Sequence, residues 1–166
     1  MRIVVIDSDV LIDIENIVST SREILRKVIK TFLISFCGAN YILIPKTVSK
    51  EVGERIIQNL HYYSNDFVGF EICEISNQRE IENLVNRFFK VVKASKEHRG
   101  EADAINQILK IGKMDNKTKI KRYGSNRIEL IFVSGDKGAL NVAENLGIEF
   151  INWKDFKPYL REILRG

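Results

Sequence analysis

Short apolar runs rich in β-branched residues alternate with longer amphipathic stretches along this chain, and that alternation constrains its fold most. Such a pattern is typical of βαβ units and a parallel sheet. The first run, residues 2–6, is built around Ile-Val-Val-Ile, as expected for a central strand covered by helices on both faces. At 166 residues the chain is long enough for one well-buried core. We therefore expect a single α/β domain over residues 1–166, a three-layer α/β/α sandwich with a parallel sheet of about five strands.

The individual elements follow from the period of the pattern and from local stop signals. Strands are expected at residues 2–6, 41–44, 70–75, 127–133 and 148–151. Helices are expected over residues 20–34, from residue 47, over 78–94, from 100 to 112, over 137–146 and over 153–164. Thr20-Ser21-Arg22-Glu23 has the form of a capping box, and Gly147 is placed to end a helix in the left-handed conformation.

The composition argues against several classes of protein. Apolar residues make up 45% of the chain, a fraction that is ordinary for a globular protein and argues against disorder. The longest apolar stretch, residues 32–44, is too short and too polar to span a bilayer, so we expect no membrane partner. Asp7 comes too early for the apolar region of a signal peptide.

The cysteines and histidines carry little functional signal in the sequence. Cys37 and Cys73 form no close pair and have no histidine spacing typical of zinc. We expect both thiols to be buried small apolar groups in a reducing, cytoplasmic setting. His61 and His98 are isolated, and we expect them to be ordinary surface or loop residues.

Acidic residues stand where an expected strand ends or an expected helix begins, in four separate segments. These acids are Asp7 with Asp9, Glu51, Glu101 with Asp103, and Asp136. In open α/β sheets, ligands bind beyond the carboxyl ends of the strands, so the four segments can meet at one place. Clustered carboxylates repel one another unless a hard cation neutralises them. The set therefore predicts a Mg²⁺ or Mn²⁺ site suited to phosphodiester chemistry.

Each acid also has a purely structural interpretation. Asp7 can cap the turn that follows it, and acids in the first turns of a helix are stabilised by the helix dipole. The small residues of Gly100-Glu101-Ala102-Asp103-Ala104 favour the site, because they let a helix end press against the sheet. Ser134, just before Asp136, is placed to hold a neighbouring carboxylate or a metal-bound water.

Positive charge is concentrated in residues 113–127, which carry six basic side chains against the single acid Asp115. A segment of this kind can follow a phosphate backbone, and it can equally be a solvated loop. Beside an acidic metal site we favour RNA as its partner. The candidate backbone contacts are Lys117, Lys119, Lys121 and Arg122, with Tyr123 as a stacking residue.

From Ile3 to about Leu160 these segments resemble the PIN domain, a nuclease family that includes toxins of toxin–antitoxin pairs and RNA-processing enzymes. The most specific segments are Val-Ile-Asp-Ser-Asp-Val-Leu-Ile at residues 5–12, Gly-Glu-Ala-Asp-Ala-Ile at 100–105 and Phe-Val-Ser-Gly-Asp-Lys-Gly-Ala at 132–139. The resemblance implies a parallel sheet in the order 3-2-1-4-5. It also implies a metal-dependent ribonuclease that uses Mg²⁺ or Mn²⁺.

The resemblance also assigns roles to individual residues. It implies that the catalytic, metal-binding acids are Asp7, Glu51, Glu101, Asp103 and Asp136. Ser8, Asp9 and Ser134 would orient these ligands. Asp9 departs from the family pattern, since most relatives have Asn there. RNA is the implied substrate, and an antitoxin, another protein or a second copy of the chain are candidate partners.

Two other functions fit parts of the pattern. A PIN-like domain with a weak acidic site would bind RNA or a protein without cleaving it. An apolar strand that ends in Asp7-Ser8-Asp9 also resembles the start of haloacid-dehalogenase-like phosphatases, in which the first Asp attacks phosphorus. Against the phosphatase, no second acid of the usual kind stands near Asp136.

Overall fold

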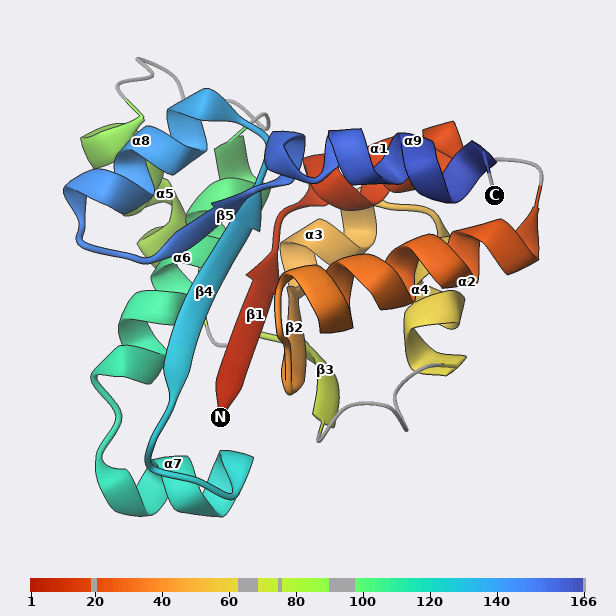
Figure 1. Cartoon of the computed structure of the whole chain (residues 1–166). Coiled ribbons are helices and arrows are strands. Elements are labelled where there is room, and N and C mark those ends of the chain that lie inside the picture. The colour runs from red at the N-terminus through yellow and green to blue at the C-terminus, as the bar shows by residue number, and fades with distance from the viewer. Residues whose placement is uncertain (19–20, 63–68, 75, 90–97, 166) are drawn as a thin grey trace.

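Five parallel strands lie between two layers of helices in a computed structural model of the chain (Figure 1). The structure describes residues 1–18, 21–62, 69–74, 76–89 and 98–165. The strands are β1 (Arg2–Ile6), β2 (Tyr41–Pro45), β3 (Gly69–Cys73), β4 (Glu129–Ser134) and β5 (Phe150–Asn152). Their order is β3-β2-β1-β4-β5 and every pairing is parallel. The predicted fold class and strand order are confirmed.

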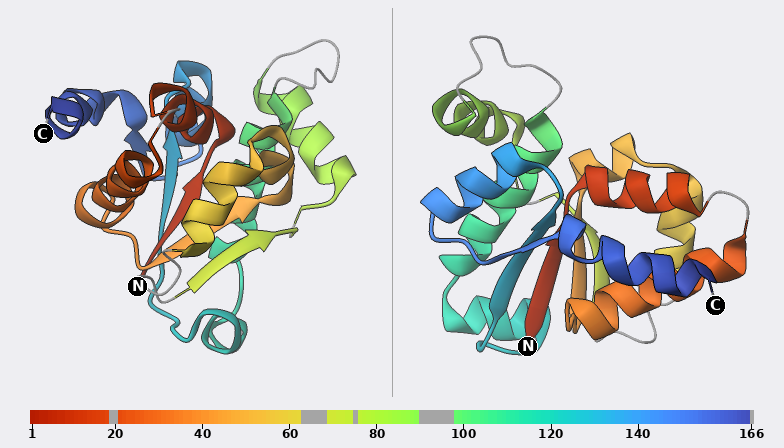
Figure 2. Two further views of the ribbon diagram at one scale, coloured as in Figure 1. Left: turned by 90° about the vertical axis from the view of Figure 1, so that its right-hand side faces the viewer. Right: turned by 45° about the horizontal axis from the view of Figure 1, so that its top comes forward.

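The helices fall on opposite faces of the sheet (Figure 2). One face carries α1 (Ser8–Ile17), α2 (Arg22–Lys30), a π-helix η1 (Thr31–Phe36), α3 (Lys46–Glu51), α4 (Glu54–Tyr62), the 3₁₀ turn η4 (Trp153–Asp155) and α9 (Lys157–Arg165). The other carries α5 (Gln78–Phe88), α6 (Arg99–Gly112), α7 (Asn116–Tyr123) and α8 (Lys137–Asn145). None of the helices in the described parts of the chain is long and apolar enough to cross a membrane.

The continuous apolar run of β1 is explained by its place at the centre of the sheet. Val4 and Ile6 point into the core beneath α1 and α2, whereas Ile3 and Val5 point into the core beneath α6 and α8. All four side chains are fully buried. A strand with one solvated face would alternate polar and apolar residues instead.

Several predicted boundaries are corrected. The helix expected over 20–34 begins at Arg22, with Ser21 as its cap, and continues as a π-helix through Phe36; Thr20 lies outside the described residues. Ser21 Oγ accepts a hydrogen bond from the Ile24 backbone N–H at 3.3 Å, which supplies the capping interaction directly. The strand expected over 70–75 is β3, which ends at Cys73.

Two further elements differ in length from their predicted ranges, and one predicted helix stop is confirmed. The helix expected over 78–94 is α5, which ends at Phe88, and residues 90–97 lie outside the described residues. The last strand, expected over residues 148–151, is β5, which begins at Phe150 and ends at Asn152. Gly147 has φ of 71°, so its predicted left-handed conformation is confirmed.

The basic segment 113–127 contains the helix α7. Asp115 caps the start of α7, because its Oδ1 accepts a hydrogen bond from the Thr118 N–H at 2.7 Å, and Gly124 ends the helix with φ of 78°. The segment lies at the edge of the sheet where β1 and β4 begin (Figure 1). The Met1 amino group confirms this placement by donating to the Arg127 carbonyl oxygen at 2.9 Å.

Candidate functional site

The acids predicted from the sequence lie around the carboxyl ends of the central strands. Asp7 follows β1, and Asp136 follows β4, which pairs with β1 in parallel. Glu51 ends α3, the helix that follows the neighbouring strand β2, and Glu101 lies in the first turn of α6. The topology therefore delivers acids from separate parts of the chain to one edge of the sheet.

Asp7 is the most buried acid of this group, with only 1% of its surface exposed. Its Oδ1 accepts a hydrogen bond from the Ser8 N–H at 2.7 Å, so Asp7 also caps α1. Its Oδ2 accepts from Ser134 Oγ at 2.9 Å. The pKa of Asp7 is raised to about 8, mainly by burial and then by the charge of Asp9, while the two hydrogen bonds oppose the shift. The structural and the site interpretations of Asp7 therefore both hold.

Ser134 connects the acids that follow β1 with the one that follows β4. Its hydroxyl donates to Asp7 and lies 3.5 Å from Asp9 Oδ1, and its Oγ accepts from the Asp136 N–H at 3.0 Å. One hydroxyl has one proton to donate, so the short bond to Asp7 dominates. The prediction that Ser134 holds a neighbouring carboxylate is confirmed.

Asp9 lies in the same cluster, held by the backbone of the β4 end. Its Oδ2 accepts from the Gly135 N–H at 2.9 Å. A Cβ at position 135 would lie 3.0 Å from that oxygen, so glycine permits the close approach. Burial raises the pKa of Asp9, the N–H groups of Gly135 and Val10 oppose the shift, and the charge of Asp136 adds to it.

Ser8 sits between Asp7 and Glu51. Its Oγ lies 3.5 Å from Asp7 Oδ1, and its side chain also hydrogen-bonds to Glu51. Glu51 is exposed, yet partial burial of its carboxylate raises its pKa; the bond from Ser8 lowers it and the charge of Asp103 raises it. Ser8 therefore contacts two of the carboxylates that it was expected to orient.

Glu101 pairs with Asp136 and with a histidine. Its side chain is only 12% exposed, and its Oε2 lies 2.9 Å from His98 Nδ1. The pKa of Glu101 is raised to about 10, first by burial, then by a hydrogen bond with Asp136 and by the charges of Asp7, Asp136 and Asp9. Two carboxyl groups can share a hydrogen bond only if one is protonated, which is why this contact raises the pKa of Glu101.

His98 lies beside the acids, although the sequence did not indicate it as a site residue. It was expected to be an ordinary surface residue, but it stacks on Phe89 with ring centroids 5.0 Å apart and faces Glu101. Ligand atoms of His98, Glu101 and Asp136 all lie within 4.8 Å of one another. The spacing His-x-x-Glu at the start of a helix, which places both side chains on one face, was the available signal. His61 is exposed, as expected.

Asp103 is buried, and hydrogen bonds from a side chain and from the backbone hold its two carboxylate oxygens. Its Oδ1 accepts from Gln107 Nε2 at 3.0 Å, and its Oδ2 accepts from the Thr47 N–H at 3.4 Å. Gln107 also donates to the Cys73 carbonyl oxygen at 2.9 Å. Asp103 therefore ties α6 to the ends of β2 and β3. Each carboxylate oxygen keeps a further lone pair, so a structural role and a ligand role are compatible.

Small residues bring the first turns of α6 against the site, as predicted. Ala102 and Ala104 belong to α6, and both are fully buried. Gly100 faces Glu51, and a Cβ there would lie 3.1 Å from Glu51 Oε1. A larger side chain at position 100 would push Glu51 away from the edge of the sheet.

The donor set fits a hard divalent cation. Carboxylate oxygens are the ligands that Mg²⁺ and Mn²⁺ prefer, and an imidazole nitrogen such as that of His98 is compatible with Mn²⁺. Burial and mutual repulsion hold the pKa values of Asp7 and Glu101 well above their usual range. A bound cation would reverse both effects by favouring the charged forms.

The predicted RNA-binding residues do not lie beside the acids. Lys117, Lys119 and Lys121 are on α7, at the opposite edge of the sheet (Figure 1). Arg122 Nη2 lies 3.1 Å from Cys73 Sγ and 3.6 Å from Glu71, so it is engaged within the protein. The stacking role proposed for Tyr123 is wrong, because Tyr123 is 4% exposed and packs edge-on against Tyr41.

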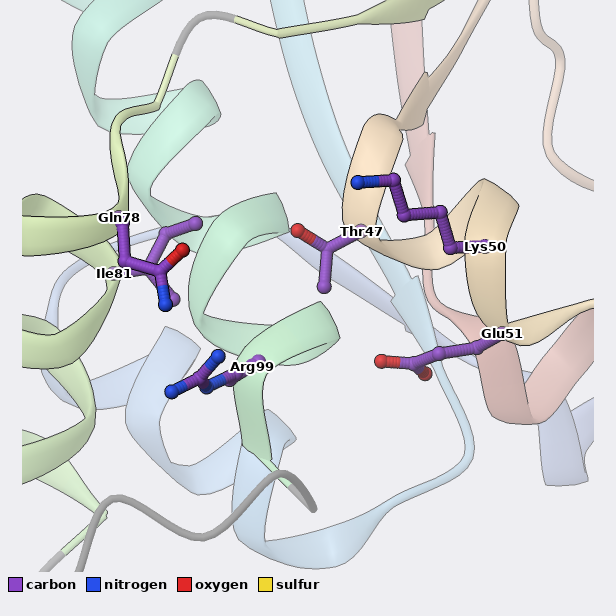
Figure 3. Close-up of a pocket in the computed structure, with 6 residues that line it drawn as sticks. All are labelled: Thr47, Lys50, Glu51, Gln78, Ile81 and Arg99. Carbon is purple, nitrogen blue, oxygen red and sulfur yellow. The ribbon is translucent and has the colours of Figure 1, made fainter.

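Two basic residues that the sequence did not single out lie close to the acids instead. Lys50 and Arg99 line a pocket of about 560 Å³ that Glu51 borders (Figure 3). Both stand outside any basic run, so charge patterning gave no signal for them.

No protein-family model and no curated protein matches this chain. Fold and geometry define its class as an all-parallel, five-stranded α/β protein with a cluster of carboxylates at the carboxyl edge of the sheet.

Proposed function

We propose that this protein is a metal-dependent endoribonuclease of the PIN-like kind, which hydrolyses phosphodiester bonds at the acidic edge of the sheet. One observation carries the proposal: Asp7 and Asp9, which follow β1, and Asp136, which follows β4, converge on Ser134. Glu101 joins them through Asp136. A cluster of buried acids that only capped helices would have no reason to accept this mutual repulsion.

The proposed metal ligands are Asp7, Glu101 and Asp136, with Glu51 and Asp103 at the border of the site. When bound, Mg²⁺ or Mn²⁺ supplies an activated water and stabilises charge on the scissile phosphate. Ser134 and the Ser8 N–H fix both oxygens of Asp7, so this carboxylate is oriented before any ligand arrives. His98 holds Glu101 in the same way through its Nδ1.

The setting of the protein is part of the proposal. Cys37 and Cys73 are both buried, and neither forms a disulfide among the described residues, which suits a reducing cytoplasm. RNA is the proposed substrate, and Lys117, Lys119 and Lys121 are proposed to contact a long RNA away from the site of cleavage. A role as a toxin would bring an antitoxin as partner, whereas a role in RNA processing would not require one.

The phosphatase alternative requires an aspartyl phosphate on Asp7, formed from a small phosphomonoester, whereas the nuclease forms none. A search for that covalent intermediate therefore distinguishes the two activities. The binding-only alternative is distinguished by titration with Mn²⁺, because a module without a metal site would bind the ion weakly and would bind RNA equally well without it.

Cleavage of end-labelled single-stranded RNA tests the proposal. We expect cleavage by the purified protein with Mn²⁺, none with EDTA, and a loss of at least about 100-fold in the Asp7→Asn variant, since Asn keeps the helix cap but removes the charge. Glu144→Gln is the matched control, because Glu144 is an exposed acid on α8. Full activity of Asp7→Asn would contradict the proposal.

A further inference from the structure

A groove runs along α3 and opens beside the acidic cluster. Its larger part is the pocket of about 560 Å³ between α3, α5 and the start of α6 (Figure 3). A smaller pocket of about 100 Å³ shares Thr47, Lys50, Gln78 and Ile81 with it and extends to Asp103. The two hollows therefore form one continuous groove from Glu51 to Asp103.

The groove carries positive charge that the described residues use only in part. Lys50 is exposed and has no ion-pair partner among the described residues. Arg99 Nε is buried and has no hydrogen-bond partner within the described parts of the chain. The Nη2 atom of Arg99 lies 3.5 Å from Glu82, at the limit of a hydrogen bond. A guanidinium with an unused, buried donor is suited to an anion with several acceptor oxygens.

The wall opposite α3 is suited to a flat, partly apolar group. Ile81 gives it an apolar surface and is 9% exposed. Gln78 presents an amide to the same pocket (Figure 3), and the hydrogen bond from its Nε2 to Glu82 Oε1 is long at 3.4 Å. An amide beside an apolar surface can read the edge of a base that packs on that surface.

The cations also solve an electrostatic problem of the site. The acids that follow β1 and β4 would repel the phosphates of an incoming polyanion. Lys50 is next to Glu51 in the chain, and Arg99 is two residues from Glu101, so both cations stand at the border of the acidic cluster. They are placed to hold a phosphate that adjoins the cluster without neutralising the acids themselves.

We propose that this groove binds the nucleotide next to the scissile phosphate, with Arg99 and Lys50 on its phosphate oxygens and Gln78 and Ile81 against its base. The assignment of that nucleotide to an RNA substrate rests on the proposed nuclease function. Binding of a nucleoside monophosphate to the groove is a separate property, and it can be measured without cleavage.

Titration of the ¹⁵N-labelled full chain with the four ribonucleoside 5′-monophosphates, in EDTA, tests the groove. We expect amide shifts concentrated at Thr47, Lys50, Gln78 and Arg99. The double variant Lys50→Gln/Arg99→Gln should bind about tenfold or more weakly, because it loses charge-assisted hydrogen bonds. Lys27→Gln/Lys30→Gln is the matched control, since it removes two exposed charges from α2, which does not line the groove.

The base contact has its own readout. Inorganic phosphate, titrated in the same way, should bind more weakly than the nucleotides and should not shift the Gln78 amide. Gln78→Ala should reduce the differences in affinity among the four nucleotides. Equal binding of phosphate and nucleotide would overturn the base contact.

Other outcomes overturn the proposal as a whole. No nucleotide binding at millimolar concentration, shifts confined to another surface, or an unchanged affinity in the double variant would each do so. RNA cleavage that needs Mn²⁺ and Asp7 but is unchanged in the double variant would overturn the role of the groove and would still support the nuclease function. Nucleotide binding in the groove by a protein that cleaves no RNA would support the groove as a nucleotide site and would contradict the nuclease function.

Discussion

Single side chains decide how the acids of this protein are held, and Ser134 has the largest part. Its buried hydroxyl donates to Asp7 and accepts from the Asp136 N–H, so it fixes groups at the ends of two neighbouring strands. A hydroxyl on Cβ both donates and accepts close to the backbone. Alanine would fill nearly the same volume but would leave Asp7 without its donor.

Replacing Ser134 with alanine should weaken metal binding. Asp7 would lose an orienting hydrogen bond, and loss of such a partner typically costs about 10-fold to 100-fold in metal affinity. Isothermal titration with Mn²⁺ measures the effect. Ser125→Ala is the control, because the hydrogen bonds of the Ser125 hydroxyl among the described residues stay within its turn, with the backbone of Arg127. An unchanged Mn²⁺ affinity in Ser134→Ala would show that the serine does not support a metal site.

Asp7→Asn should stabilise the protein in EDTA at high pH. The pKa of Asp7 rises from 3.8 to about 8 on folding, so its contribution to stability is complete below pH 4 and is lost as the pH rises towards 8. Asn resembles the protonated acid and does not titrate. We expect the variant to exceed the wild type by about 1–3 kcal/mol in free energy of unfolding at pH 8, and by little at pH 4.

Urea denaturation at the two pH values checks this expectation. A wild type that grows more stable between pH 4 and pH 8 relative to the variant would contradict it. Saturating Mn²⁺ should reverse the order at pH 8, since the cation stabilises the charged carboxylate of the wild type and has less to bind in the variant.

At the scale of elements, the start of α6 is where local helix stability and the site compete. Glycine is a poor helix former, yet Gly100 stands in the first turn of α6. The close approach of Glu51 explains its presence, because a Cβ would meet Glu51 Oε1 at 3.1 Å. The Gly100 position therefore favours the placement of Glu51 over the stability of the helix.

Gly100→Ala should separate stability from activity. The alanine removes backbone entropy from the unfolded chain, and Glu51 can swing away, so we expect stability to rise by about 0.5 kcal/mol. Mn²⁺-dependent RNA cleavage should fall, because Glu51 is displaced. Gly112→Ala, in the last turn of the same helix, would place a Cβ 3.9 Å from Leu130 Cδ1 and should leave cleavage unchanged. Equal activity of the two variants would contradict a role for Glu51.

The basic helix α7 makes a prediction that depends on the length of the RNA. Neutralising Lys117, Lys119 and Lys121 together should lower the salt dependence of binding to a long single-stranded RNA by a slope of about 2. Binding of a dinucleotide should not change, since β1 and β4 separate α7 from the acids. Filter binding at several salt concentrations measures both. An unaltered slope with the long RNA would exclude α7 as a contact.

For the whole molecule, much of the fold could be predicted because periodicity, strand apolarity and stop signals agree. The unbroken apolar run of β1 indicated a central strand, and β1 is central. The strand order came from the resemblance to PIN domains rather than from the pattern. The π-helix after α2 was not predicted, because its apolar pattern continues that of α2 without a break.

The site was predicted in part, and the errors have physical reasons. Asp7, Asp136 and Glu101 could be placed because each follows a strand or lies in the first turn of a helix, whereas Glu51 ends α3. His98, Lys50 and Arg99 stand alone in the sequence and are brought beside the acids only by packing. The order of the chain also indicates where α7 lies, although the prediction of RNA contacts beside the acids did not take that order into account. Residues 113–127 directly precede β4, so they must lie at the edge where that strand begins, opposite its carboxyl end.

If these carboxylates converge to hold a divalent cation, crystals grown or soaked with Mn²⁺ should show its anomalous scattering at this edge of the sheet. We expect a peak among the carboxylates of Asp7, Glu101 and Asp136, with His98 at its border. Crystals at millimolar Mn²⁺ with no peak there would contradict a metal site.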